Sequence, residues 1–136
     1  MKQVAKLVMI DGEGKYLLMY RSDHPTFGKD ADLPGGTVED GESLREAMVR
    51  EVEEEAGVSI DAASVEEVYS GADYSEHGTY KSLFVAKLDH RPEITMSWEH
   101  SAYEWIEREE FLKKAKSAND TYMHMVYEVL RVKRGD

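Results

Sequence analysis

Glutamate residues are concentrated in a short part of the sequence between Ser43 and Gly57. Ser43 and Glu46 have the spacing of a capping box, in which each side chain satisfies a free backbone amide of the first helical turn. Gly57 can adopt the left-handed conformation that commonly ends a helix. The sequence therefore predicts a glutamate-rich helix from about Ser43 to Ala56.

The spacing of the apolar residues decides which of these glutamates face the core. Successive helical residues are about 100° apart, and the residues within about 60° of Glu51 are Leu44, Ala47, Met48, Glu54 and Glu55, with Val52 at the edge. The opposite side carries Arg45, Glu46, Val49 and Glu53. A run of glutamates usually forms a solvated face. Here the apolar stripe continues into Glu51, Glu54 and Glu55. These three carboxylates are therefore predicted to face the core, and Glu46 and Glu53 to face solvent.

Carboxylates that converge in this way repel one another and resist ionisation unless a cation compensates them. A hard divalent cation with oxygen ligands provides that compensation. A calcium-binding loop that begins at Asp30 and continues through Asp32 is excluded, because its fifth position would be Pro34 and its twelfth Gly41. The sequence also contains no His-Glu-x-x-His zinc motif and no cysteine. The carboxylates of the helix are therefore the expected metal ligands.

The composition of the 136 residues is that of an ordinary globular protein, with 41% hydrophobic and 33% charged residues. A formal net charge of −11 argues against partners such as nucleic acid or an anionic membrane. No apolar run approaches the roughly 20 residues of a membrane span, and the N-terminal residues resemble a strand instead of a signal peptide. We therefore expect a cytoplasmic protein with a single domain over residues 1–136.

The elements around the glutamate-rich helix predict a mixed α/β domain. Strands are expected at residues 4–10, 16–20, 65–70, 80–88 and 103–106, with a short strand end and glycine bend at 33–36. The first two strands flank a turn at residues 11–15 and are predicted to form a hairpin. A loop is expected at residues 22–32, and further helices are expected at about 108–116 and 122–132.

The predicted helix and the loop before it resemble the signature of the Nudix family. That signature is glycine, five residues, glutamate, seven residues, Arg-Glu, an aliphatic residue, any residue, Glu-Glu, any residue, glycine and an aliphatic residue. Its constrained positions are filled here by Gly36, Glu42, Arg50, Glu51, Val52, Glu54, Glu55, Gly57 and Val58. The preceding Leu33-Pro34-Gly35 is also similar to the family. Many members have tryptophan where this chain has Ala31, which leaves open how this loop packs or binds.

The resemblance implies an α/β/α sandwich around a mixed β-sheet, and hydrolysis of a nucleoside diphosphate linked to another group. By match to the signature, the metal ligands are Glu51, Glu54 and Glu55 together with the Gly35 carbonyl. Glu51, Glu54 and Arg50 are the implied catalytic residues, and Arg50 orients the acidic side chains. Glu42 supports the junction of loop and helix. The implied cofactor is Mg²⁺, for which Mn²⁺ can substitute, because phosphoryl transfer needs metal ions to polarise phosphate oxygens and position the attacking water.

Residues outside the signature are further candidates. The segment 98–105 resembles one found after the signature in several Nudix subgroups, where Glu99 is an extra metal ligand or the base that deprotonates water. The alternative is a surface loop before a strand. His100 is a second candidate base, although a lone histidine is more often structural or exposed. Arg21 can hold a phosphate by bidentate contact or be a solvated strand-end residue. Four residues that either stack on a base or pack in the sheet are Tyr74, His77, Tyr80 and Trp98.

The leading functional interpretation is a hydrolase that converts a nucleoside triphosphate, or a related small-molecule nucleotide, into a monophosphate and pyrophosphate. A dinucleoside polyphosphate hydrolase or a nucleotide-sugar hydrolase is the enzyme alternative. A nucleotide-sensing module on the same fold is the alternative from another class, and such modules typically lose acids of the signature, none of which is lost here. An isomerase with a similar signature uses a cysteine, which this chain lacks. The sequence does not indicate the oligomeric state.

Overall fold

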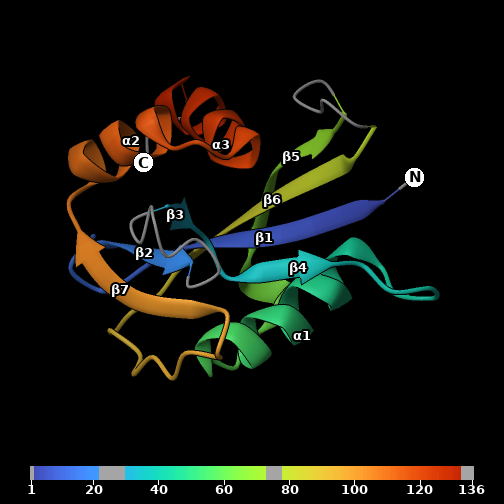
Figure 1. The fold of residues 1–136 in the computed structure, drawn as a ribbon. Coiled ribbons are helices and arrows are strands. Elements are labelled where there is room, and N and C mark those ends of the chain that lie inside the picture. The colour runs from blue at the N-terminus through green and yellow to red at the C-terminus, as the bar shows by residue number, and fades with distance from the viewer. Residues whose placement is uncertain (1, 22–29, 73–77, 133–136) are drawn as a thin grey trace.

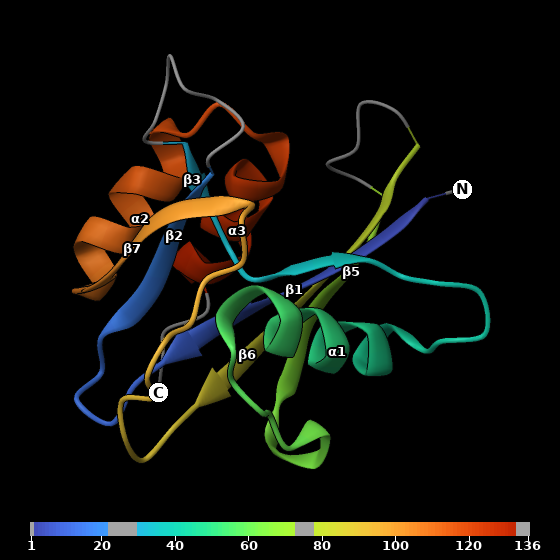
Figure 2. The same ribbon diagram turned by 60° about the horizontal axis from the view of Figure 1, so that its bottom comes forward.

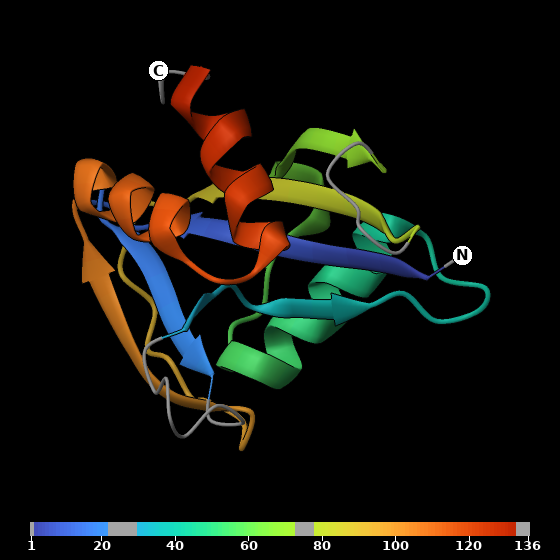
Figure 3. The same cartoon turned by 45° about the horizontal axis from the view of Figure 1, so that its top comes forward.

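A mixed β-sheet lies between helices on its two faces (Figure 1). The structure is a computed structural model that describes residues 2–21, 30–72 and 78–132. Helix α1 (Leu44–Ala56) covers one face of the sheet, and helices α2 (Arg108–Ser117) and α3 (Thr121–Val132) cover the other, which is clear in the turned views of Figure 2 and Figure 3. This layering confirms the predicted α/β/α sandwich.

Strand β1 (Gln3–Ile10) forms the centre of the sheet. It pairs in parallel with β6 (Tyr80–Lys87) over its whole length, and antiparallel with β4 (Gly35–Thr37) in its N-terminal half. Strand β5 (Glu66–Gly71) pairs with the other edge of β6. Since helices cover both faces, every residue of β1 from Leu7 onward is buried.

Strands β2 (Tyr16–Arg21), β3 (Ala31–Asp32) and β7 (His100–Ile106) form the other part of the sheet. Strand β2 follows β1 in an antiparallel hairpin that is paired at Ile10 and Tyr16. Beyond that pair, β1 is bonded to β4, whereas β2 is bonded to β3 and β7. The two parts of the sheet therefore diverge from the hairpin, as Figure 2 shows.

The hairpin turn is held by the buried carboxylate of Asp11. Its Oδ1 accepts hydrogen bonds from the backbone N–H groups of Glu13 and Lys15, at 2.8 and 2.9 Å, and its Oδ2 accepts one from Nε of Arg91 at 2.6 Å. Burial alone would raise the pKa of Asp11, but these donors lower it below its ordinary value. The predicted hairpin is confirmed.

Helix α1 begins and ends where the sequence predicts. The Ser43 hydroxyl accepts from the Glu46 N–H at 3.0 Å, and the Glu46 carboxylate accepts from the Ser43 N–H at 2.8 Å, so the capping box is complete. Gly57 follows the helix with φ of 70°, and its N–H donates to the Glu53 carbonyl at 2.9 Å. Both ends are fixed by local contacts, which is why they can be read from the sequence.

The sheet divides the hydrophobic core into two halves. Because successive strand residues point to opposite faces, Leu7 and Met9 of β1 pack toward α1, whereas Val8 and Ile10 pack toward α2 and α3. The half under α2 and α3 includes Phe111, which is fully buried. Within the part of the chain that the structure describes, no helix is long and apolar enough to cross a membrane.

The structure differs from the predicted elements in three places. Strand β7 begins at His100, three residues before the predicted start, because it continues past an irregularity in register to pair His100 with Arg21. Strand β3 lies within the predicted loop 22–32, of which residues 22–29 are outside the described residues. A short 3₁₀ helix, η1 (Ala62–Ser64), was not predicted.

Replacement of Gly57 by alanine tests the C-terminal end of α1. A left-handed alanine costs about 1–2 kcal/mol, and the added Cβ would lie 2.9 Å from Cβ of Thr95. Gly14→Ala is the matched control, because Gly14 has a φ of 81° and nothing within 4 Å of the built Cβ. We expect both variants to lose stability in urea unfolding, and Gly57→Ala to lose more. Equal losses of stability would mean that Thr95 moves to accommodate the added methyl group.

Candidate active site

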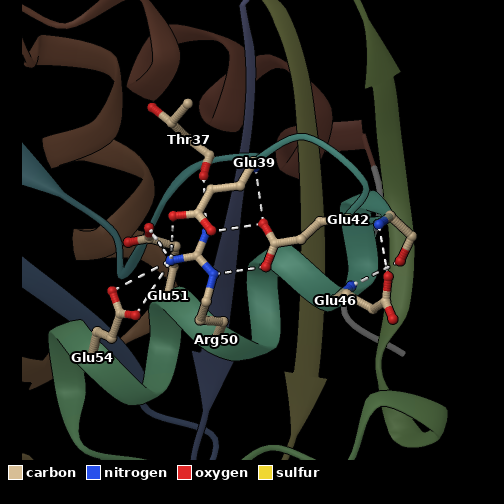
Figure 4. Close-up of polar contacts among 8 residues, drawn as sticks. Thr37, Glu39, Glu42, Glu46, Arg50, Glu51 and Glu54 are labelled. Atoms are coloured by element: carbon tan, nitrogen blue, oxygen red, sulfur yellow. Dashed lines mark hydrogen bonds and ion pairs between the residues drawn. The ribbon is translucent and has the colours of Figure 1, made fainter.

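The guanidinium group of Arg50 connects the acidic side chains at the N-terminal side of the site (Figure 4). Its Nε and Nη2 donate to the two carboxylate oxygens of Glu42, at 2.7 and 3.0 Å. Its Nη1 donates to Glu51 at 2.8 Å and to Glu54 at 3.3 Å, and Nη2 donates to the Thr37 carbonyl at 3.1 Å. One cation therefore compensates three carboxylates and bonds the backbone next to strand β4.

Glu42 joins the loop to the helix at the junction expected for it. Besides the two bonds from Arg50, its Oε1 accepts from the Glu39 N–H at 2.9 Å. The hydrogen bonds from Arg50, and then the one from the Glu39 backbone, lower the pKa of Glu42 to about 2. Glu42 is therefore ionised at neutral pH.

Two glycines bring strand β4 close to β1 and to helix α1. A Cβ atom on Gly36 would lie 2.5 Å from Oε2 of Glu51, and one on Gly35 would lie 2.4 Å from the carbonyl oxygen of Ala5. Gly35 also has a φ of 146°, which disfavours any side chain. Only glycine at these positions lets the strand pass between β1 and the Glu51 carboxylate.

The three glutamates expected on the core-facing side differ in exposure. The side chains of Glu51 and Glu55 are 17% and 6% exposed, but that of Glu54 is 57% exposed. The prediction is therefore wrong for Glu54, which lies at the edge of the apolar stripe and is held at the surface by Arg50. Glu53 is exposed, as predicted. On the opposite side, Arg45 is half-buried because it donates to the carbonyls of Ala62 and Val65.

Glu51 and Glu55 both have a pKa above the ordinary value. Burial is the main cause for Glu51, opposed by Arg50 and reinforced by the charges of Glu54 and Glu99. Burial is also the main cause for Glu55, opposed by a hydrogen bond from Ser97 and reinforced by Glu99 and Glu51. The carboxylates therefore repel one another in a half-dry environment, as the sequence predicts.

A cavity of about 260 Å³ opens beside these carboxylates, between the diverging parts of the sheet. Of the predicted site residues, it is lined by Gly35, Glu55, Glu99 and Arg21. Lys2 and Lys6 of the N-terminal region also line it, so acidic and basic groups share its wall. Glu51, Glu54 and Arg50 are outside the lining, and Glu51 lies against Gly36, which is part of it.

The donor set suits a hard divalent cation, because ionised carboxylates with raised pKa values gain from a positive charge nearby. Among the described residues, however, no three acidic or histidine side chains form a cluster that could hold an ion as they are placed. Glu51 and Glu54 are bonded to Arg50 instead. Metal binding at this site therefore requires the acidic side chains to move closer together than they are placed here.

Glu99 lies on the segment before β7, opposite the glutamates of α1. Its N–H donates to the Ser97 hydroxyl at 3.3 Å, and its exposed side chain is near enough to raise the pKa of Glu51 and Glu55. The neighbouring Trp98 is 83% exposed and also lines the cavity. Of the other aromatic candidates, Tyr80 is half-buried in β6, whereas Tyr74 and His77 lie outside the described residues.

Lys6 and Asp32 were not predicted as site residues. Nζ of Lys6 lies 2.5 Å from Oδ1 of Asp32, and Nε2 of His100 lies 3.0 Å from Oδ2 of the same carboxylate. All three residues line the cavity. A signal was present, because Lys6 falls between Val4 and Val8 on one face of a strand that is otherwise apolar there. A charged residue at such a position needs a buried partner.

Comparisons with known proteins agree on one family. The family model described as the NUDIX domain matches residues 1–126. An ADP-ribose pyrophosphatase from Methanocaldococcus jannaschii is 43% identical over 75 residues, which are 55% of this chain and 44% of that protein. An asymmetrical bis(5'-nucleosyl)-tetraphosphatase from Caenorhabditis elegans is 32% identical over 88 residues, which are 62% of this chain and 64% of that protein. The chain thus spans less than two thirds of the length of these curated relatives.

The fold is also found in solved structures. The crystal structure of a MutT protein from Methanosarcina mazei Go1 superposes with a TM-score of 0.73 and 23% sequence identity. The superposition covers 98% of this chain and 95% of the other. At this level of identity the similarity concerns the fold, and it extends over all of its layers.

The ion pair of Arg50 and Glu42 predicts a pH-dependent contribution to stability. A carboxylate whose pKa falls from 4.5 to about 2 on folding stabilises the protein above the unfolded value, and this contribution is lost as the pH falls toward about 2. Glu42→Gln should therefore lower the midpoint of urea unfolding at neutral pH. The difference from wild type should shrink between about pH 5 and about pH 3.

Glu39→Gln is the control for this titration, because the Glu39 carboxylate is 3.8 Å from Arg50 and its side chain is 68% exposed. We expect a small and nearly pH-independent effect for this variant. If the effect of Glu42→Gln stayed constant with pH, packing and not charge would account for it.

Proposed function

Because the chain belongs to the Nudix family, we propose that it is a metal-dependent hydrolase of phosphoanhydride bonds in small-molecule nucleotides. The observation that carries this proposal is the junction of β4 and α1, where the complete signature lies around one site. Glu51 contacts Gly36, and Glu55, Glu99 and Gly35 line the adjoining cavity. All the acidic residues of the signature are present, whereas nucleotide-sensing modules typically lose some of them, and a hydrolase uses such carboxylates to hold its metal.

We assign the metal to Glu51, Glu54, Glu55 and Glu99, together with the Gly35 carbonyl, and Mg²⁺ is the proposed ion. When bound, the ion supplies charge that polarises phosphate oxygens and a water molecule of lowered pKa. Magnesium prefers oxygen ligands and keeps several of its waters, so a partly exposed set of carboxylates suits it. Mn²⁺ has the same ligand preference and should substitute.

The residues of the chain supply position and charge around the substrate. Arg21, Lys2 and Lys6 line the same cavity as Glu55 and Glu99, so cationic side chains are placed to bind a polyphosphate there. Arg50 fixes the orientation of Glu51 from one side. Glu99, exposed and facing the α1 glutamates, is the proposed acceptor for the proton of the attacking water.

A nucleoside triphosphate that releases a monophosphate and pyrophosphate is the leading substrate class. The cavity of about 260 Å³ lies just below the usual range of ligand pockets, roughly 300–1,000 Å³, and so favours the smaller of the candidate substrates. Nucleotide sugars and dinucleoside polyphosphates remain the alternative substrates. They are supported by the relatives named as an ADP-ribose pyrophosphatase and a bis(5'-nucleosyl)-tetraphosphatase.

The central test is hydrolysis of a panel of nucleoside triphosphates, ADP-sugars and dinucleoside polyphosphates, read as release of phosphate or pyrophosphate. We expect turnover with Mg²⁺ or Mn²⁺, none with excess chelator, and recovery when metal is restored. Glu54→Gln and Glu55→Gln should each lose activity because they remove a metal ligand. Glu53→Gln is the matched control, since the Glu53 side chain is exposed and accepts a hydrogen bond from the Ser59 hydroxyl, away from the site. Full activity in chelator, or equal losses at Glu53 and Glu55, would refute the proposal.

Glu99→Gln separates the roles proposed for this residue. Loss of a positioned proton acceptor lowers turnover by roughly 10² to 10⁴, and no metal concentration restores it. Loss of a supplementary ligand is instead partly rescued by more metal, because only the metal affinity has fallen. Metal titrations of both proteins at saturating nucleotide distinguish the two outcomes. Unchanged turnover at every metal concentration would remove Glu99 from the site and make Glu51 the next candidate base.

A further inference from the structure

Three side chains in the wall of the cavity, all largely shielded from solvent, form a continuous chain of polar contacts. Lys6 on β1 is bonded to Oδ1 of Asp32 on β3, and Oδ2 of Asp32 is bonded to Nε2 of His100 on β7. The side chains of Lys6, Asp32 and His100 are 12%, 8% and 1% exposed. Both oxygens of Asp32 are thus committed to neighbours within the protein. Asp32 therefore links Lys6 to His100, and neither of its oxygens is left without a protein partner for binding a ligand.

The contact with Asp32 determines that Nε2 of the His100 ring is protonated. Burial would raise the pKa of Asp32, but Lys6 and His100 hold it well below its ordinary value, so the carboxylate is ionised. An ionised carboxylate can only accept hydrogen bonds. Nε2 of His100 must therefore be the donor in this contact, and the orientation of the ring is set from behind.

The other ring nitrogen of His100 points toward Glu55. Nδ1 lies 4.0 Å from Oε2 of Glu55, and it is a buried atom without a hydrogen-bond partner among the described residues. Buried polar atoms without partners are rare, and each one calls for a physical explanation. At this distance one small bridging group, such as a water molecule, can bond both Nδ1 and the carboxylate.

Glu55 is already enclosed by the segment that leads to His100. The Ser97 hydroxyl donates to Oε2 of Glu55 at 2.8 Å, and the Ser97 N–H donates to the Glu55 carbonyl at 3.3 Å. The Thr95 N–H bonds the next carbonyl of the helix, that of Ala56, at 2.8 Å. Figure 2 shows this segment running beside the end of α1 before it enters β7. The Ser97 hydroxyl and Nδ1 of His100 therefore both approach Oε2 of Glu55, so they orient the carboxylate from one side.

We infer that His100 is a positioning residue for Glu55, and that Asp32 and Lys6 hold its ring in place for this task. The inference rests on the proposed function, in which Glu55 is a metal ligand. Groups that orient a metal ligand from behind change metal affinity or activity by about 10- to 100-fold when they are removed. His100 then contributes to metal binding without touching the metal or the nucleotide.

Two substitutions at His100 separate its two contacts. His100→Gln retains a polar group where Nε2 contacts Asp32 but removes the one at Nδ1. His100→Asn retains a polar group near the Nδ1 position. We expect His100→Gln to weaken Mn²⁺ binding in calorimetry by at least about tenfold and to lower kcat, with KM for the nucleotide close to wild type. His100→Asn should recover part of the Mn²⁺ affinity. Equal Mn²⁺ affinity in His100→Gln and wild type, or equal losses in both variants, would overturn the inference.

The link through Asp32 has its own test. Asp32→Asn should weaken Mn²⁺ binding as His100→Gln does. The double variant should lose no more Mn²⁺ affinity than the more strongly affected single variant, because the effects of residues that act as one unit are not additive. Additive losses would contradict the chain.

Lys114→Met controls for general destabilisation. It removes an ion pair of 2.7 Å with Glu104 on the α2 side of the sheet, where Lys114 also bonds Tyr20. We expect a lower melting temperature with unchanged Mn²⁺ affinity. A parallel loss of Mn²⁺ affinity in Lys114→Met would assign the His100 effect to stability and overturn the inference. A wild-type protein that neither binds Mn²⁺ nor hydrolyses any nucleotide would overturn the proposed function as well, whereas failure of the variants alone would leave it intact.

Discussion

Repulsion among carboxylates is the constraint around which this molecule is arranged. Besides burial, the charge of Glu99 raises the pKa of both Glu51 and Glu55, and Glu51 raises that of Glu55, in a chain whose net charge is −11. Bulk electrostatics cannot relieve this, so relief must be local. Arg50 supplies it from within the helix, and its bonds to Glu42 and to the Thr37 carbonyl make the same guanidinium a support for the loop and the backbone beside β4. Charge compensation and loop structure therefore depend on one side chain.

The divergence of the two parts of the sheet provides the cavity beside these carboxylates. If β1 and β2 stayed paired along their length, the surface between them would be closed by backbone hydrogen bonds. Instead β1 exchanges β2 for β4, and β2 exchanges β1 for β3, so residues from both parts line a common cavity. The two glycines of β4 permit the close approach that this exchange requires. Ordinary side chains at Gly35 and Gly36 would push strand, helix and carboxylate apart.

The features that could be predicted from sequence depend on neighbours along the chain. The ends of α1, the hairpin at Asp11 and the alternation of strand residues follow from local rules, and the structure confirms them. The exposure of Glu54 was missed although its partner Arg50 lies only one helical turn earlier. The early start of β7 could not be predicted, because strand β2 decides it through tertiary contacts. Asp32 is the clearest example. Its partners Lys6 and His100 lie on two other strands, and no spacing in the sequence brings the three together.

The parallel pairing of β1 with β6 has a consequence for the synthesis of the chain. Strand β1 is synthesised before β6, and the elements from β2 to β5 are synthesised between these two paired strands. Contacts that close such long loops form late. Until then the hairpin of β1 and β2 presents an apolar strand with an open edge, which is a known liability for association with other chains. The order of the elements along the chain thus leaves the β1 edge open to association with other chains until β6 has been synthesised.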